Sequence, residues 1–283
     1  MIIFRKIQDL KKYISGEKKA GRAPGFIPTM GALHTGHLSL IGKAKADNML
    51  TICSIFLNPT QFNDKKDLEK YPVSTEDDIE LLIKAGCDVL FLPSVDEIYP
   101  GGESAIRAYD FGYLDTMLEG AKRHGHFRGV GQVVGRLLEI VEPGALYLGQ
   151  KDYQQCLVIK KLVAIMGLTE LKVVICSTMR EGDGLAMSSR NRRLTEPQRA
   201  IAGTIYQCLV SIESKQNTCS FGVVRKECED ILRAKGFDPE YVALANAGDL
   251  TLLDDYKKDT PMVALIAARI GDIRLIDNIL LDA

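Results

Sequence analysis

Short apolar runs alternate with longer amphipathic stretches along the N-terminal part of the chain. Residues 51–57 (TICSIFL) and 87–92 (CDVLFL) are nearly continuous apolar runs, as expected of strands that are buried on both faces. The whole pattern predicts strands at residues 25–30, 51–57, 87–92, 145–148 and 171–176, and helices at residues 36–45, 75–85, 130–141 and 152–166. This alternation predicts an α/β fold with a Rossmann-like, doubly wound parallel sheet. Ligands of such sheets bind at the carboxyl ends of the strands.

The pattern changes near residue 178. Helical and strand-like stretches now occur in separate blocks, with helices at residues 196–214 and 223–235 and strands at residues 241–245 and 262–270. We therefore predict two domains, a Rossmann-like domain at residues 1–177 and a smaller C-terminal α+β domain at residues 178–283. The Gly-containing loop at residues 180–184 is interpreted as a hinge.

Composition and charge exclude several classes of protein. The 36 Lys and Arg residues balance 37 Asp and Glu residues, whereas a general nucleic-acid-binding protein would carry a strong basic excess. No apolar stretch approaches the roughly 20 residues that span a membrane, and the N-terminal apolar run is too short for a signal peptide. The seven cysteines are scattered and form no C-x-x-C pair, which is typical of thiols in a reducing compartment. We expect a cytoplasmic protein without nucleic-acid or membrane partners.

The strongest chemical signal is the segment PTMGALHTGH at residues 28–37, between a predicted strand and a predicted helix. A helix N-terminus presents free backbone N–H groups and the positive end of the helix dipole to an anion. His34 and His37 are three residues apart, and each imidazole can donate to a phosphate oxygen. Gly36 allows close approach of the backbone. The alternatives are two surface histidines without a role, or a zinc site, which would need further ligands that the sequence does not supply.

A second segment is Met-Ser-Ser-Arg-Asn at residues 187–191. Two hydroxyls followed by a cation suit the outer phosphates of ATP, although alone such a run is often a solvated turn. A His-x-Gly-His turn combined with a downstream Met-Ser-x-basic loop is far more specific. The combination resembles the nucleotidyl-transferase superfamily, which includes the class I aminoacyl-tRNA synthetases.

Two more strand ends carry polar side chains. In the segment GQKDYQQ at residues 149–155, Lys151 and Gln155 are four residues apart and share a helix face. Asn58 and Gln61 follow another buried strand and should face the same crevice. The polar loop at residues 63–70 is a candidate for closing over bound substrate, although an ordinary solvated connection fits its composition nearly as well.

Taken together, these segments resemble the pantoate–β-alanine ligase family over most of the chain. The motifs that carry the resemblance occur in the family's order and spacing: PTMGALHTGH, FLNPTQF, YP-x-x-x-x-DD, GHFRGV, GQKDYQQ, LAMSSRN and the terminal RLIDN. One departure is His124, which stands where the family usually has proline before Gly-His-Phe. Losing that proline could loosen a loop, but it removes no group with an assigned chemical role.

The resemblance implies a two-step reaction with ATP as a substrate and Mg²⁺ as the accompanying ion. The carboxylate of (R)-pantoate attacks the α-phosphorus of ATP, which gives pantoyl adenylate and pyrophosphate. The amine of β-alanine then attacks the activated carbonyl, which releases AMP and pantothenate. The resemblance also implies a homodimer that acts on small molecules only.

The resemblance assigns roles to individual residues as well. It implies that the catalytic groups on the ATP phosphates are His34, His37, Lys151, Ser188 and Arg190, with Ser189 as a nearby partner. It implies that Asp152 contacts the ribose and that the nucleotide pocket is also lined by Met30, Gly149 and Met187. Pantoate would be held by Gln61 and Gln155, with Met30 and Asn58 beside it, and Asp77 would contact the Mg²⁺ and phosphate cluster. Both main pantoate ligands are neutral amides, which would preserve the nucleophilicity of the carboxylate better than an Arg pair would.

Three alternatives remain open at this point. Another His-x-Gly-His nucleotidyl transferase acting on a phosphate would need additional cationic groups. An aminoacyl-tRNA synthetase fragment fits poorly with the neutral charge. A catalytically inactive binding protein would be expected to lack at least one of the phosphate-contacting groups.

Overall fold

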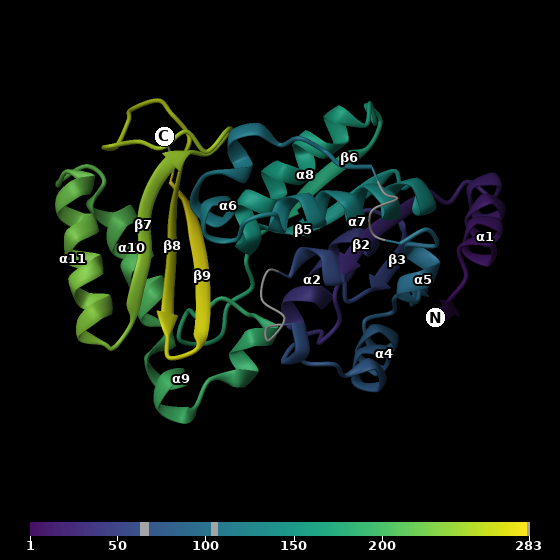
Figure 1. Cartoon of the computed structure of the whole chain (residues 1–283), viewed down its shortest axis with the longest axis horizontal. Coiled ribbons are helices and arrows are strands. Elements are labelled where there is room, and N and C mark those ends of the chain that lie inside the picture. Colours follow the sequence, from purple (N-terminus) through teal and green to yellow (C-terminus); the bar gives the residue numbers. More distant parts are fainter. Residues whose placement is uncertain (63–67, 103–106, 282–283) are drawn as a thin grey trace. The chain divides into compact units, whose positions relative to one another are not determined.

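A computed structural model of the chain describes residues 1–62, 68–102 and 107–281 (Figure 1). The described chain divides into two compact units, Met1–Gly149 with Val158–Ser177, and Gln150–Leu157 with Thr178–Ala283. The second unit therefore consists of the short segment Gln150–Leu157 and of all residues after Ser177. The functional division at residues 177 and 178 stays a prediction. Of the loop expected to close over substrate, residues 63–67 lie outside the described residues.

The first unit is built on a six-stranded sheet in the order β1-β4-β3-β2-β5-β6, and every pairing is parallel. The strands are β1 (Ile2–Phe4), β2 (Pro24–Thr29), β3 (Leu50–Ile55), β4 (Val89–Phe91), β5 (Ala145–Gly149) and β6 (Lys172–Cys176). The predicted parallel α/β sheet is therefore confirmed. The sequence pattern missed β1, because this edge strand has only three residues and leaves Ile2 and Ile3 exposed.

Helices cover both faces of this sheet. They are α1 (Ile7–Lys19), α2 (Thr35–Ala46), α4 (Thr75–Lys84), α5 (Val95–Ile98), α6 (Leu118–Lys122), α7 (His126–Val141) and α8 (Tyr153–Ile165), with short 3₁₀ turns η1 (Pro59–Gln61) and η3 (Gly112–Asp115). The 3₁₀ turn η4 (Gln150–Asp152) and the first residues of α8 belong to the second unit. Residues of α2 and α4 share one apolar core with Ile27, Cys53 and Leu90 of the central strands. Figure 1 shows α2 and α4 on one side of β2 and β3, and α7 on the other.

The second unit contains a three-stranded antiparallel sheet, β7-β8-β9, which confirms the predicted α+β character. Its strands are β7 (Asp238–Asn246), β8 (Met262–Ile270) and β9 (Ile273–Leu281), and its helices are α9 (Glu196–Ala202), α10 (Thr204–Lys215) and α11 (Phe221–Ala234), preceded by the 3₁₀ turn η5 (Ser189–Arg193). The side chains of α10 and α11 form one core with the inward residues of the sheet. The sequence pattern missed β9, which follows β8 after a two-residue turn with Gly271 at φ 56°.

The single helix predicted at residues 196–214 is wrong at one point, because it is interrupted at Gly203. A Cβ atom at Gly203 would lie 2.8 Å from the carbonyl oxygen of Asp183, so the chain approaches too closely for a side chain. The segment interpreted as a hinge is a hydrogen-bonded turn inside the second unit. Arg180 pairs with Ala186 in an isolated bridge, and Glu181 N–H donates to the Leu185 carbonyl at 2.9 Å. None of the helices that the structure describes combines the length and apolar character needed to cross a bilayer.

Candidate active site

A buried carboxylate shapes the turn between β2 and α2. Asp78, which is 1% exposed, accepts the backbone N–H groups of Ala32 at 2.8 Å and Leu33 at 2.7 Å. The Ser74 hydroxyl donates to the same carboxylate at 3.2 Å. Gly31 has φ 84°, and a Cβ atom there would lie 3.0 Å from Asp78 Oδ2, which explains the glycine. Asp78 therefore determines how β2 leads into the helix that carries the two histidines.

Sequence reasoning missed Asp78 and selected its neighbour. Asp77 is exposed in the first turn of α4, whereas Asp78 and Leu82, four residues apart, are the buried residues of this helix. The helical period of the apolar positions could have indicated that Asp78 faces inward. The role of Asp77 in binding Mg²⁺ stays a prediction. Among the described residues, no three His, Cys, Asp or Glu side chains are grouped so that they could hold a metal ion.

The two motif histidines form a reciprocal cap at the N-terminus of α2. Gly36 N–H donates to His34 Nδ1 at 3.1 Å, and His34 N–H donates to His37 Nδ1 at 3.3 Å. Because both Nδ1 atoms accept hydrogen bonds, each neutral imidazole carries its proton on Nε2. The ring centroids are 4.1 Å apart. The first turn of α2 has no acidic residue, so the positive end of the helix dipole is not neutralised by its own side chains.

The amides at the end of β3 form a buried network. Asn58 donates both hydrogens of Nδ2, to Gln61 Oε1 at 3.1 Å and to the Gly129 carbonyl at 3.2 Å, and its Oδ1 accepts from the Tyr99 hydroxyl at 2.7 Å. Gln61 Nε2 in turn contacts Met30 Sδ at 2.9 Å. Asn58 is 1% exposed. The structure thus brings three of the predicted pantoate residues together, and the geometry of Asn58 favours positioning Gln61 over direct contact with a ligand.

His126 is a further member of this network that sequence reasoning did not assign to the site. Its Nε2 lies 2.8 Å from Arg123 Nη1 and its Nδ1 lies 2.8 Å from the Gln61 carbonyl oxygen. A guanidinium can only donate, so Nε2 accepts and the proton of the neutral ring is on Nδ1, which donates to Gln61. The available signal was that the chain has only four histidines and that this one lies in the GHF motif. Exposed His124, at the family's proline position, precedes Gly125 at the start of α7.

In the second unit, the phosphate loop and Lys151 lie on short 3₁₀ turns. The Ser188 hydroxyl caps η5 by accepting from Arg190 N–H at 3.3 Å, and Ser189 beside it is buried. The side chain of Lys151, in η4, is 18% exposed and lies 3.7 Å from Asp152 Oδ1. Asp152 itself is exposed.

The remaining predicted residues are placed as follows. Gln155 is half-buried in the first turn of α8, and Met187 N–H donates to the Met179 carbonyl at 2.9 Å. Gly149 is the last residue of β5, where a Cβ atom would meet no other atom within 4 Å. The backbone at Gly149 is therefore open to close approach, as the nucleotide-pocket prediction requires.

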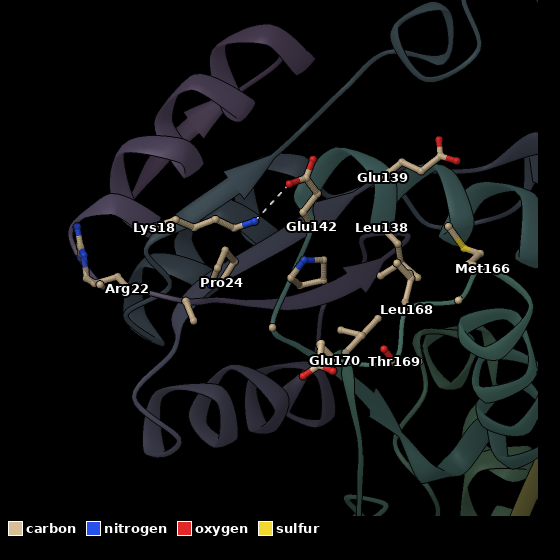
Figure 2. Close-up of a pocket in the computed structure, with 16 residues that line it drawn as sticks. Lys18, Arg22, Pro24, Leu138, Glu139, Glu142, Met166, Leu168, Thr169 and Glu170 are labelled. Carbon is tan, nitrogen blue, oxygen red and sulfur yellow. Dashed lines mark hydrogen bonds and ion pairs between the residues drawn. The ribbon is translucent and has the colours of Figure 1, made fainter.

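A large cavity of the first unit lies away from all these residues (Figure 2). Its volume is about 760 Å³, and it is formed at the amino ends of β2, β5 and β6, where Pro24, Gly144 and Leu171 line it. Figure 2 shows the Lys18–Glu142 ion pair at its rim. A smaller cavity of about 270 Å³ lies at the carboxyl ends of β2, β3 and β4 and is lined by Met30 and Asp78, among others. Ligands of such sheets bind at the carboxyl ends of the strands. The smaller cavity is therefore the better candidate for part of the active site, although the other cavity has the greater volume.

A parallel sheet with a helix N-terminus directly after a central strand is an arrangement typical of nucleotide-binding α/β proteins. A family model described as Pantoate-beta-alanine ligase matches residues 2–280. The chain is 43% identical over 284 residues to a pantothenate synthetase of Cytophaga hutchinsonii, and the alignment covers 99% of both chains. It is 41% identical to a pantothenate synthetase of Porphyromonas gingivalis, with 99% of both chains covered.

Solved structures agree with these relatives. Pantothenate synthetase from Thermus thermophilus superposes with a TM-score of 0.89 at 37% identity, covering 99% of each chain. A pantoate-beta-alanine ligase from Francisella tularensis, complexed with β,γ ATP and β-alanine, gives a TM-score of 0.83 at 38% identity, covering 99% of this chain and 97% of that one. The chain therefore belongs to the pantoate-beta-alanine ligase family, which confirms the resemblance read from its motifs.

The cap at His34 can be tested by two substitutions. His34→Ala removes the acceptor for Gly36 N–H and should lower the free energy of unfolding by about 1 kcal/mol. His34→Asn places an amide oxygen near the position of Nδ1 and should retain most of that stability. Urea unfolding of both variants measures the difference. Equal losses in the two variants would show that the ring, and not its Nδ1 acceptor, stabilises the helix.

The proton position of His126 leads to a second prediction. His126→Phe leaves the Gln61 carbonyl and the Arg123 hydrogen-bond donor without the imidazole, and it should lower the free energy of unfolding by about 1–3 kcal/mol. His126→Asn can still donate to the Gln61 carbonyl and should cost less. Thermal or urea unfolding distinguishes the two. If Asn is as damaging as Phe, the donated hydrogen bond contributes nothing measurable.

Proposed function

We propose that this chain condenses (R)-pantoate with β-alanine, using ATP, to give pantothenate, AMP and pyrophosphate through pantoyl adenylate. The observation that carries the proposal is the match of residues 2–280 to the pantoate-beta-alanine ligase family. The relative from Francisella tularensis that was solved with β,γ ATP and β-alanine supports two of the three substrates.

The chemistry requires activation of a carboxylate. A carboxylate is a poor acyl donor until one of its oxygens becomes part of a good leaving group, and transfer to the α-phosphorus of ATP achieves this. Pantoate is already ionised at neutral pH, so the first step needs no general base. The second step needs only a neutral amine held against the mixed anhydride. Orientation in a closed site can supply much of the acceleration, since effective molarities of well-oriented groups reach about 10⁵–10⁸ M.

His34 and His37 stabilise the charge that grows as pyrophosphate leaves. Their reciprocal hydrogen bonds support this role, because they place each proton on Nε2 and fix both rings at the start of α2. The backbone N–H groups of that helix terminus add to the same field. Fixed donors of this kind stabilise developing charge without reorganising during the reaction.

Residues of the second unit hold the outer phosphates and the ribose. Lys151, Ser188 and Arg190 bind the phosphates, with Ser189 beside them, and Asp152 contacts the ribose. The cap that Ser188 makes on Arg190 N–H supports a loop of defined shape. Gly149, Met187 and Met30 line the nucleotide pocket, and the open space at Gly149 is compatible with that placement.

Gln61 and Gln155 hydrogen-bond pantoate, with Met30 packing beside it. The network around Gln61 supports this assignment, since Asn58 and His126 hold its side-chain oxygen and its backbone carbonyl in place. Asn58 then acts through Gln61, which refines its predicted role as a pantoate residue.

Mg²⁺ would accompany the ATP and neutralise part of the phosphate charge. Asp77 is the carboxylate we propose for it, and a single exposed carboxylate suits an ion that keeps several waters and binds substrate phosphates. We further propose a homodimer located in the cytoplasm. The homodimer rests on the family resemblance, and sedimentation of the purified protein would test it. The cytoplasmic location rests on the reducing pattern of scattered thiols.

The proposed reaction predicts how products depend on substrates. Pyrophosphate release from ATP and Mg²⁺ should require pantoate, and pantothenate should form only when β-alanine is added, as detected by mass spectrometry. Pyrophosphate release without pantoate would identify another nucleotidyl transferase. Folded protein with no release at all would favour a binding protein.

The proposed role of His34 can be tested in the same assay. His34→Asn retains the cap on α2 but lacks the Nε2–H donor, so this variant should lower kcat by about 10²-fold.

The neutral amide of Gln155 gives a further prediction. Gln155→Arg should lower the single-turnover rate of adenylate formation even at saturating pantoate, because a guanidinium would reduce the nucleophilicity of the carboxylate. The control is Gln207→Arg, a substitution of an exposed glutamine on α10. An unchanged rate in the Gln155 variant would show that the amide is not needed to keep the carboxylate reactive.

A further inference from the structure

The terminal motif RLIDN has no role in the proposed reaction, yet it places two buried polar residues in β9. Asp277 is 4% exposed and Asn278 is 2% exposed. Burying an amide and a carboxylate is unfavourable unless both are fully hydrogen-bonded. The partners of these two side chains therefore indicate what the motif does.

The partners of Asn278 are in the turn that carries Lys151. Asn278 Nδ2 donates to the Gln150 carbonyl at 3.0 Å and to the Lys151 carbonyl at 2.8 Å, and its Oδ1 accepts from Gln150 Nε2 at 3.3 Å. Both amide hydrogens and the amide oxygen of Asn278 thus bind η4. The Tyr153 hydroxyl adds a hydrogen bond to the Ala247 carbonyl at 2.7 Å. These bonds explain why Gln150–Leu157 belongs to the second unit, although residues on both sides of it in the chain belong to the first.

The partner of Asp277 is Arg180. Its Nη1 lies 2.5 Å from Asp277 Oδ2 and its Nη2 lies 3.1 Å from Asp277 Oδ1, which is a bidentate pair. Burial raises the pKa of the Asp277 carboxyl, and the charges of Arg180 and Lys151 oppose that rise. Arg180 also donates to the Asn278 carbonyl at 3.3 Å. Its guanidinium also lies 4.0 Å from the centre of the Tyr206 ring, a cation–π contact that further restricts its position.

Arg180 also belongs to the turn that leads into the phosphate loop. It donates to the Gly184 carbonyl at 3.0 Å and pairs with Ala186 in the backbone bridge, directly before Met187. A Cβ atom at Gly184 would collide with the Tyr206 ring, so the turn and the Arg180 guanidinium both pack closely against this ring. Met187 N–H donates to the carbonyl of Met179, the residue before Arg180, so hydrogen bonds and adjacent residues together link Met187 through Arg180 and β9 to Lys151.

We propose that Asn278, together with the Arg180–Asp277 pair, is a positioning device that fixes the spacing between Lys151 and the Met187–Arg190 loop. The inference rests on the proposed function, in which Lys151, Ser188 and Arg190 bind the phosphates of ATP. Asparagine suits this place because two donors and one acceptor are required there. Aspartate would have the same shape but would face two carbonyl oxygens with a negative charge.

The test uses the full-length protein and the isosteric variant Asn278→Asp. We expect kcat/KM for ATP to fall by about 10²-fold, since a displacement of about 1 Å of a positioned group has that effect. KM for β-alanine should stay unchanged, and hydrogen exchange of the amides of residues 150–152 should become faster. Asn217→Asp, in the exposed turn between α10 and α11, is the matched control and should change none of these.

A double-mutant cycle with Lys151→Ala separates positioning from general stability. If Asn278 acts through Lys151, Asn278→Asp should have little further effect on kcat/KM for ATP in the Lys151→Ala background. Asn278→Ser, which keeps one donor, should lie between the wild type and the aspartate variant, and it provides a second measurement if the aspartate variant does not fold.

Two outcomes would overturn the inference. One is a lowered unfolding temperature with unchanged kcat/KM for ATP, and the other is an effect that multiplies fully with that of Lys151→Ala. In either case the network merely holds β9 in the sheet. Failure of the proposed function would look different, because the wild-type protein itself would then release no pantoate-dependent pyrophosphate. If such a protein still binds ATP, calorimetric affinities of the same variants replace kcat/KM and decide the inference.

Discussion

The arrangement of the histidine turn depends on one buried carboxylate, that of Asp78. It accepts two consecutive backbone N–H groups in the turn after β2, where Gly31 and Ala32 both have positive φ. Without that acceptor, both N–H groups would lose their hydrogen bonds to the carboxylate, and the turn with its positive φ angles would lose a source of stability. The start of α2, and with it the orientation of both imidazoles, follows from this contact. The residue that controls the site in this way comes from α4, far along the chain.

The same principle recurs at predicted site residues in each of the two units. Asn58 and His126 hold Gln61 by its side chain and its backbone, and Asn278 holds the Lys151 turn by two carbonyl oxygens. In each case a buried polar side chain with satisfied hydrogen bonds fixes a segment that carries a proposed ligand of the substrates. In general, positioning contributes to rate when groups are held in a defined arrangement before the substrate binds.

Much of the fold could be predicted because its signals are local. Apolar runs located β2 to β6, and the alternation with helices gave the parallel sheet. The short edge strand β1, the strand β9 and the break at Gly203 were missed. At the break, the Asp183 carbonyl approaches Gly203 closely from a turn some twenty residues earlier in the chain. A pattern of apolar positions holds no information about such an approach.

The family, the parallel sheet and the segments that carry the chemistry could all be identified without coordinates, because the motif residues are adjacent along the chain and their types limit what they can bind. The folded chain was needed to show which tautomers His34, His37 and His126 adopt, that Asp78 and not Asp77 faces the turn, and that Asn278 binds the backbone at Lys151. The hydrogen bonds of Asp78, His126 and Asn278 join residues distant in sequence, whereas those of His34 and His37 are local and form only in the folded turn. A buried polar group takes its role from whichever donor or acceptor folding brings to it.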